Sequence, residues 1–289
     1  MNKILKFNKN KFDLENPVLG CYLNMPNELY HACAGISNTG LNLIKDNPAN
    51  YIWSKNAPQD PSKTNAIDIG SAVHACLLEP EKIDQILVGP TKGRDTIKFA
   101  QFCEENQGKI VLTETEYTQV KYSVDSALAH PTIAEILGLK SHNESSMFWR
   151  DEGTLCKIRP DMDLTPSGIN ALVDVKVTKS IDEWRSDLTW KNPLFTLNYG
   201  HNAAFYLRGA SAHYGVDYDV YSFMLIQSTA CIGRYPVTVF SVTRQELENY
   251  GFFDDVENNL NKYKECINSG KWDHIESFPF FEGMIEGSE

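Results

Sequence analysis

One stretch, LCKIRPDMDLTPSGINALVDVKVTK at residues 155–179, constrains the fold more than any other part of the chain. The cluster TPSG, residues 165–168, consists of turn-forming residues. The residues that follow it, 171–177, are rich in β-branched side chains and alternate between apolar and charged. The stretch therefore predicts a β-hairpin with its turn at TPSG.

Charged side chains take defined positions in this hairpin. Because side chains alternate along a strand, Asp174 and Lys176 share one face while the valines beside them share the other. Asp161 follows Pro160 at the end of the first strand, where the hairpin can bring it beside Asp174. Two carboxylates would bind a hard divalent cation such as Mg²⁺. A neighbouring lysine would orient an attacking water or stabilise developing negative charge.

The composition agrees with a folded domain in a reducing compartment. A chain of 289 residues, 42% of them hydrophobic, can bury a large core, and its mixture of patterns predicts an α/β (α+β) class. No apolar run is long enough to cross a bilayer, and the first residues lack the apolar segment of a signal peptide. The seven cysteines are scattered without a CxxC pair, which argues against a zinc site or a disulfide framework. We expect a cytoplasmic protein with no membrane contact.

The net charge of −11 looks wrong for a nucleic-acid protein, since neutralising phosphates requires Lys and Arg. The distribution of charge along the chain changes this interpretation, because residues 155–210 carry a net charge of +1 and the rest of the chain carries −12. The acidity therefore lies outside the candidate site. It argues against an open basic face but does not exclude an interior lined for DNA.

The flanking segments supply further elements. Residues 1–29 look irregular and predict an N-terminal extension. Ser37 can cap a helix that ends at Asn47-Pro48. The segment IDIGSAVHACLLEP predicts a helix with His74 in its middle, where a histidine is more often a packed core residue than a functional one.

Strands and a helix surround the hairpin. Residues 144–149 predict a strand that would form a three-stranded antiparallel meander with the hairpin. A helix follows from about residue 196 to 213, with Tyr199 and Asn202 on one face. Residues 220–227 predict a buried strand.

This order of elements resembles the core of the PD-(D/E)XK nuclease superfamily, a central mixed sheet flanked by helices. Pro160-Asp161 matches its first half-motif, and Asp174-Val175-Lys176 matches the second. Longer segments, from about residue 30 to 275, are similar to the nuclease domain of RecE-type exodeoxyribonucleases (exodeoxyribonuclease VIII): AGISNTGLNLIKDNPANYIWSKNAP, IDIGSAVHACLLEP, ESSMFWRDEGTLCKIRPD, DVKVTKS and CIGRYPVTVF. The resemblance implies an exonuclease domain over residues 30–275, with the extension 1–29 before it and a tail, 276–289, after it.

The resemblance also implies an activity. Such enzymes are Mg²⁺-dependent, with Mn²⁺ as a substitute, and degrade linear double-stranded DNA from the 5′ end. The product is a 3′ single-stranded tail for a RecT-like single-strand annealing protein in DNA recombination. The family forms closed homo-oligomeric rings, here expected to be a tetramer, and occurs in phages and prophages of bacterial host cells. A ring with a central channel would explain an acidic exterior.

By position, the resemblance assigns roles to site residues. It implies that Asp161 and Asp174 bind metal, that His74 is the motif histidine and that Lys176 is catalytic. Our hypothesis is that the Val175 carbonyl and His74 complete the metal ligands and that all of these groups take part in catalysis. Lys176 between two carboxylates should stay protonated, because opposite charges favour the charged form.

Five further residues are candidates for the site, and some of them also have a simpler structural interpretation. Glu144 could contact a metal ligand or a metal-bound water, or be a surface acid at a strand edge. Ser37 and Arg159 could bind DNA phosphates, but Ser37 could also serve only as a helix cap. Tyr199 and Asn202 could line the DNA site. The family commonly has Gln where Asn202 stands, so the shorter amide leaves its role open.

Two other functions remain open from the sequence. One is a PD-(D/E)XK endonuclease, which would cut covalently closed circular DNA. The other is a catalytically inactive DNA-binding protein of the same fold, although Asp161, Asp174 and Lys176 are all present.

Overall fold

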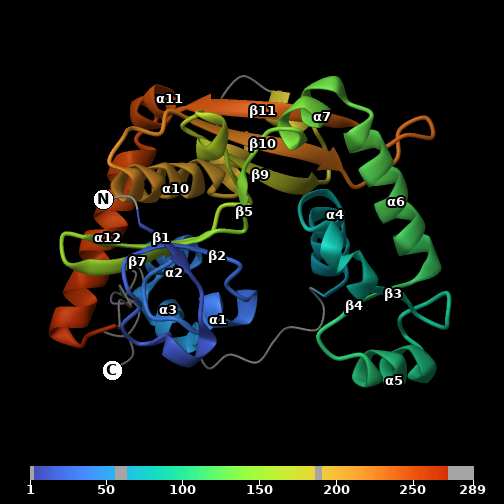
Figure 1. Cartoon of the computed structure of the whole chain (residues 1–289), viewed down its shortest axis with the longest axis horizontal. Helices are drawn as coiled ribbons and strands as arrows, with labels where there is room; N and C mark the ends of the chain where they lie inside the picture. Colours follow the sequence, from blue (N-terminus) through green and yellow to red (C-terminus); the bar gives the residue numbers. More distant parts are fainter. Residues whose placement is uncertain (1–2, 56–63, 186–190, 273–289) are drawn as a thin grey trace, which may run out of the picture.

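The structure is a computed structural model that describes residues 3–55, 64–185 and 191–272 (Figure 1). Its strands are β1 Ile4–Lys6, β2 Gly20–Leu23, β3 Ile86–Val88, β4 Ile110–Leu112, β5 His142–Asn143, β6 Ser146–Asp151, β7 Thr154–Ile158, β8 Met162–Asp163, β9 Ala171–Thr178, β10 Val220–Gln227 and β11 Val237–Thr243. Its α-helices are α1 Asn27–Ala32, α2 Asn38–Asp46, α3 Pro48–Ser54, α4 Thr64–Leu78, α5 Ile97–Glu105, α6 Glu114–Leu128, α7 Pro131–Leu137, α8 Asp182–Arg185, α9 Pro193–Thr196, α10 Tyr199–Tyr214, α11 Arg244–Asn249 and α12 Phe252–Ser269.

A five-stranded mixed sheet forms the centre, in the order β11-β10-β9-β8-β5. β9 and β10 are parallel, and β10–β11, β8–β9 and β5–β8 are antiparallel. The predicted turn at 165–168 is present as a 3₁₀ turn closed by Gly168 at φ 75°, a conformation that glycine adopts without strain. The predicted α/β class with a central mixed sheet is confirmed.

The predicted three-stranded meander is wrong. β6 and β7 belong to a second sheet, in the order β1-β2-β6-β7, whereas β8 and β9 belong to the central one. The chain passes from one sheet to the other between Ile158 and Met162. Pro160 lies in this passage, and because proline has no N–H to donate, it cannot continue a ladder. Glu144 also lies outside β6, at φ 51° between β5 and β6.

Residues 3–29 contain two short paired strands, which corrects the prediction of an irregular segment. β2 pairs antiparallel with β6, and β1 pairs parallel with β2. Tyr22 and Met25 are buried in a small core with Phe148 of β6. The strands were missed because they are only three and four residues long. The domain limits at residues 30 and 275 stay predictions, and the predicted tail 276–289 lies outside the described residues.

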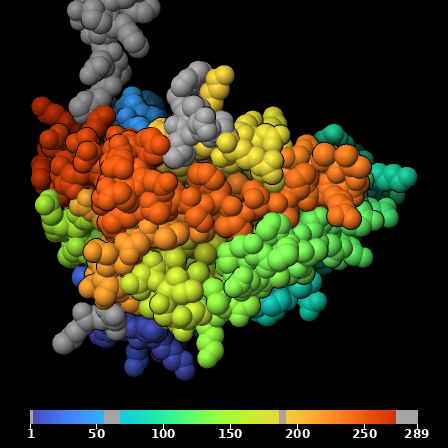
Figure 2. All heavy atoms as spheres, turned by 90° about the horizontal axis from the view of Figure 1, so that it is seen from above, coloured from blue at the N-terminus to red at the C-terminus, as the bar shows by residue number. Residues whose placement is uncertain are grey.

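Two cores cover the faces of the central sheet. The larger lies between α10 and the strands of both sheets, and the other lies between the opposite sheet face and α4, α6 and α7. In Figure 1 the sheet runs along the top, with α1, α2, α3 and α12 below its left end and α4, α5 and α6 below its right. Seen from above, the edge strand β11 lies at the surface, in orange, beside the green segment that contains α6 and α7 (Figure 2). No helix in the described part of the chain has the length and hydrophobicity that a transmembrane span requires.

We predict that Gly209→Ala destabilises the protein. A Cβ at Gly209 of α10 would lie 2.7 Å from the Trp149 ring and 2.9 Å from the Ile158 side chain, closer than packed side chains allow. Overpacking of this kind costs about 1–3 kcal/mol of unfolding free energy, measurable by urea denaturation. The control is Gly70→Ala in α4, where a Cβ meets nothing within 4 Å, so helix propensity should make it neutral or stabilising by up to about 1 kcal/mol. Equal effects of the two substitutions would contradict the packing described.

Candidate active site

The passage between the two sheets places Asp161 in the centre of the site. Asp161 Oδ2 accepts a hydrogen bond from the backbone N–H of Val175 at 2.7 Å. Continuing the β8–β9 register, which pairs Met162 with Val173, would set Pro160 opposite Val175. The Asp161 carboxylate thus receives the Val175 N–H at the point where proline ends the ladder. The predicted proximity of Asp161 to the second strand of the hairpin is present in the structure.

Asp174 and Lys176 lie on the face of β9 that packs toward α10. Lys176 Nζ lies 2.6 Å from Asp174 Oδ2, and the Tyr221 hydroxyl of β10 donates to Asp174 Oδ1 at 3.3 Å. The valines of β9 pack on the opposite face with α4, as the alternation predicted. The carboxylate of Asp174 is therefore held on both sides, by an ammonium and by a hydroxyl.

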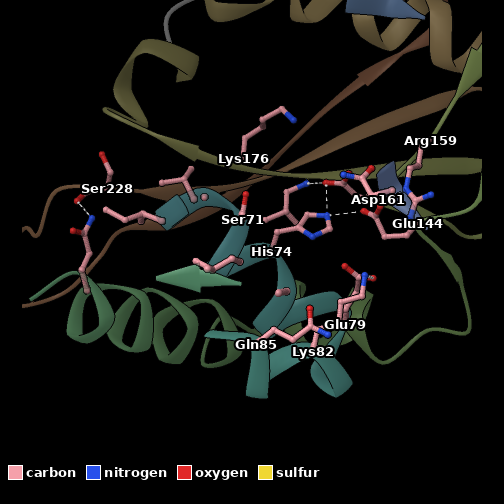
Figure 3. A pocket seen from close by; sticks show the side chains of 18 of the residues that line it. Ser71, His74, Glu79, Lys82, Gln85, Glu144, Arg159, Asp161, Lys176 and Ser228 are labelled. Carbon is pink, nitrogen blue, oxygen red and sulfur yellow. Dashed lines mark hydrogen bonds and ion pairs between the residues drawn. The ribbon is translucent and has the colours of Figure 1, made fainter. Parts of the chain in front are cut away.

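His74 approaches Asp161 from the other face of the sheet. Its Nε2 lies 3.0 Å from Glu144 Oε1 and 3.4 Å from Asp161 Oδ2. Figure 3 shows these three side chains converging, while Lys176 extends away from His74. One possible ligand atom from each of the three side chains lies within 4.8 Å of the other two. The histidine that the sequence left between a core and a functional role belongs to this polar cluster.

Arg159 holds Glu144 in place. Its Nε donates to Glu144 Oε2 at 2.5 Å, and its Nη1 donates to the Met25 carbonyl at 2.9 Å and to Ser146 Oγ at 2.8 Å. Glu144 is therefore not a surface acid. Because Nε and Nη1 of Arg159 are used inside the protein, this geometry favours ordering of Glu144 over the phosphate contact that the sequence suggested.

The charges in the site balance one another. Burial lowers the pKa of His74, but its hydrogen bonds to Asp161 and Glu144 raise it to about 10. Burial raises the pKa of Asp174 to about 6 against the attraction of Lys176. Burial alone would lower the pKa of Lys176, but the carboxylates of Asp174 and Asp161 raise it above its ordinary value. This agrees with the expectation that Lys176 stays protonated.

Two clefts meet at Asp161 and Lys176, which line both. The cleft of about 1110 Å³ contains His74 and Glu144, and the cleft of about 870 Å³ contains Asp174. The site therefore opens on both sides of β9.

The remaining predicted DNA contacts lie along these clefts. Tyr199 lines the larger cleft, with Lys176 Nζ 5.7 Å from its ring centroid. Ser37 and Asn202 line the smaller cleft. Ser37 also caps α2, since its hydroxyl accepts from the Gly40 N–H at 3.4 Å. Their contacts with DNA stay predictions.

The donor set fits a divalent cation. The carboxylates of Asp161 and Glu144 converge with the imidazole of His74. Hard cations bind carboxylate oxygens, and Mn²⁺ also binds imidazole nitrogen. Without a cation, the positive charges of His74 and Lys176 balance the clustered carboxylates. Asp161, Glu144 and His74 would hold the ion on one side of β9. Asp174 and the Val175 carbonyl are the predicted further ligands.

Sequence reasoning missed Tyr221 as part of the site. Residues 220–227 were identified as a buried strand, but its partner was not. The parallel register pairs Tyr221 with Leu172 and Phe223 with Asp174, which sets the tyrosine on the Asp174 face. Given that pairing, alternation would have found Tyr221.

Comparisons with known proteins place the fold. Residues 37–275 match the model of a PDDEXK-like domain of unknown function (DUF3799). The chain belongs to this PDDEXK-like family. No curated protein matches the chain.

One solved structure shares the fold. The crystal structure of a "putative exonuclease" from Eubacterium rectale is similar with a TM-score of 0.58 at 15% identity, covering 85% of this chain and 86% of that one. A second structure, of SSO0001, reaches only a TM-score of 0.27 at 13% identity, over 76% of this chain and 84% of that one, and carries no weight. The PDDEXK-like fold predicted from the half-motifs is thus confirmed.

We predict that Arg159→Met weakens Mn²⁺ binding about tenfold, because residues that orient a metal ligand typically contribute factors of about 10–100 to affinity. Isothermal titration calorimetry of the protein with MnCl₂ measures it. Arg150→Met on β6 is the matched control, since Arg150 is exposed and donates only to the Gly153 carbonyl at 2.7 Å within the described residues. Unchanged Mn²⁺ affinity in folded Arg159→Met protein would show that Arg159 does not order a metal ligand.

Proposed function

We propose that this PDDEXK-like protein is a Mg²⁺-dependent 5′-to-3′ exonuclease on linear double-stranded DNA. The observation that carries the proposal is the position of the Asp161 carboxylate. Its Oδ2 contacts both His74 Nε2 and the Val175 N–H, and the Asp174–Lys176 pair lies on the same strand as Val175. Carboxylates, an imidazole and a protonated lysine around one strand suit the hydrolysis of a phosphodiester.

The side chains divide this work. When bound, a divalent cation would polarise the scissile phosphate and activate the attacking water. Lys176, held protonated by Asp174, orients that water and stabilises the charge that develops on the phosphate. Tyr221 fixes the other oxygen of Asp174. Arg159 fixes Glu144, so the carboxylates keep their geometry before substrate arrives.

The preference for DNA ends, the direction and the partners rest on the resemblance to RecE-type enzymes. In this proposal the product is a 3′ single-stranded tail that a RecT-like annealing protein uses in recombination. The protein acts as a ring, expected to be a tetramer, in the cytoplasm of a bacterial host. The charge distribution supports an enclosed DNA path, because the acids lie mainly outside residues 155–210.

We predict that Asp174→Asn and Lys176→Met each lower nucleotide release from linear duplex DNA by about a hundredfold or more, since each removes a group that acts on the reacting phosphate. Fluorescence anisotropy without divalent ion should show DNA binding retained. Lys121→Met on α6, an exposed lysine, is the matched control and should keep full activity. Full nuclease activity of Asp174→Asn would refute this assignment of the site.

We also predict that covalently closed circular duplex is resistant, whereas the same plasmid is degraded once linearised. Phosphorothioate linkages at the 5′ termini should protect the linear form, and the same linkages at the 3′ termini should not. Gel electrophoresis and acid-soluble release measure both. Cutting of the closed circle would identify an endonuclease instead, and protection by 3′ linkages alone would reverse the direction.

A further inference from the structure

His201, in the first half of α10, is fully buried at 0% exposure and takes no part in the site described above. Its Nδ1 lies 2.9 Å from Asn38 Oδ1, on the first residue of α2. Its Nε2 lies 3.0 Å from Asn259 Nδ2 of α12, whose side chain is also buried. These three residues, from three helices, form a continuous chain that we call the amide–imidazole relay.

The contacts of the relay define the proton position on His201. Burial lowers the pKa of His201 to about 4, and nearby Lys45 acts in the same direction, so the imidazole is neutral. A neutral imidazole has one donor and one acceptor nitrogen. Asn259 Nδ2 can only donate, so Nε2 accepts. Nδ1 therefore carries the proton and donates to Asn38 Oδ1.

This orientation determines what Asn38 presents to the cleft. With Oδ1 held by His201, the planar amide directs Nδ2 away from the buried imidazole. Asn38 is half-buried and lines the cleft of about 870 Å³ that also contains Asp161, Asp174 and Lys176. Among the described residues none accepts a hydrogen bond from Asn38 Nδ2. An amide NH₂ group is thus available to an acceptor in that cleft.

We propose that the amide–imidazole relay orients Asn38 so that its Nδ2 donates to a non-bridging phosphate oxygen of DNA in this cleft. His201 and Asn259 are then positioning residues. This inference rests on the proposed nuclease function. Phosphate oxygens only accept hydrogen bonds, so the reversed amide would present an oxygen that repels them. Protonation of His201 on Nδ1 is therefore the state that holds Asn38 in the orientation that suits a phosphate.

Two substitutions of His201 separate the halves of the relay. An asparagine at 201 places an amide near the position of Nδ1 and can still donate to Asn38. A glutamine places its amide near the position of Nε2, so the contact with Asn259 is kept and the donor to Asn38 is lost. His201→Asn and His201→Gln are thus matched in polarity and differ in which partner they serve.

Steady-state kinetics on linear duplex DNA test the proposal. Asn38→Ala and His201→Gln should each lower kcat/KM about tenfold or more, mainly through KM, because a hydrogen bond to a charged oxygen is lost. His201→Asn should lose less. The double variant Asn38→Ala/His201→Gln should lose no more than Asn38→Ala alone, since both act through one contact. Thermal unfolding of each variant corrects for the folded fraction.

A long-range ¹H–¹⁵N correlation spectrum of histidine-labelled protein reports the His201 tautomer directly. The expected result is a neutral ring protonated on Nδ1 at pH 7. A ring protonated on Nε2 or on both nitrogens, or wild-type kcat/KM in Asn38→Ala, overturns the proposal. If the wild-type protein releases no nucleotides, the proposed function fails. The proposed role of the relay is then tested by measuring DNA affinity through the fluorescence anisotropy of a labelled duplex. Equal DNA affinity of wild-type and Asn38→Ala protein would then overturn it.

Discussion

The hydrogen bond from the Val175 N–H to the Asp161 carboxylate organises the site. Proline ends the strand that precedes it, and the chain leaves one sheet for the other at this point. The carboxylate of Asp161 then accepts the Val175 N–H that lies beyond the paired residues. This fixes Asp161 at the junction of the two sheets, where side chains from β9, α4 and the residues before β6 reach it. The Pro160-Asp161 pair thus connects the two sheets and also supplies the Asp161 carboxylate to the site.

Electrostatic balance explains why so many acids can lie together. Three carboxylates, on Glu144, Asp161 and Asp174, would repel one another in a partly buried site. Arg159, His74 and Lys176 each contact one or two of them, so each carboxylate has a cationic partner. A divalent cation bound by His74, Glu144 and Asp161 would take the place of the His74 proton, because an imidazole coordinates a metal only in its neutral form. The same arrangement keeps Lys176 charged, which suits water orientation and charge stabilisation better than proton abstraction.

The sequence predicted the local elements around the site well, because they depend on local signals. The turn at 165–168, the alternation of β9 and the helix with His74 follow from turn chemistry and periodicity. The pairing of strands did not follow, since it depends on contacts between distant residues. β6 and β7 were assigned to one meander with β9, and the pairing of β2 with β6 was missed. Arg159 illustrates the limit, because only the fold shows that its guanidinium is committed to Glu144.

In the proposed enzyme, Asp161 joins an imidazole–carboxylate cation site to the catalytic strand. Pulsed electron paramagnetic resonance of the Mn²⁺-loaded protein tests it most directly. We expect ¹⁴N modulation from a coordinated imidazole in the wild-type protein, its loss in His74→Asn, and loss of stoichiometric Mn²⁺ in Asp161→Asn. Mn²⁺ bound with equal stoichiometry and no nitrogen coupling in the wild-type and Asp161→Asn proteins would contradict it.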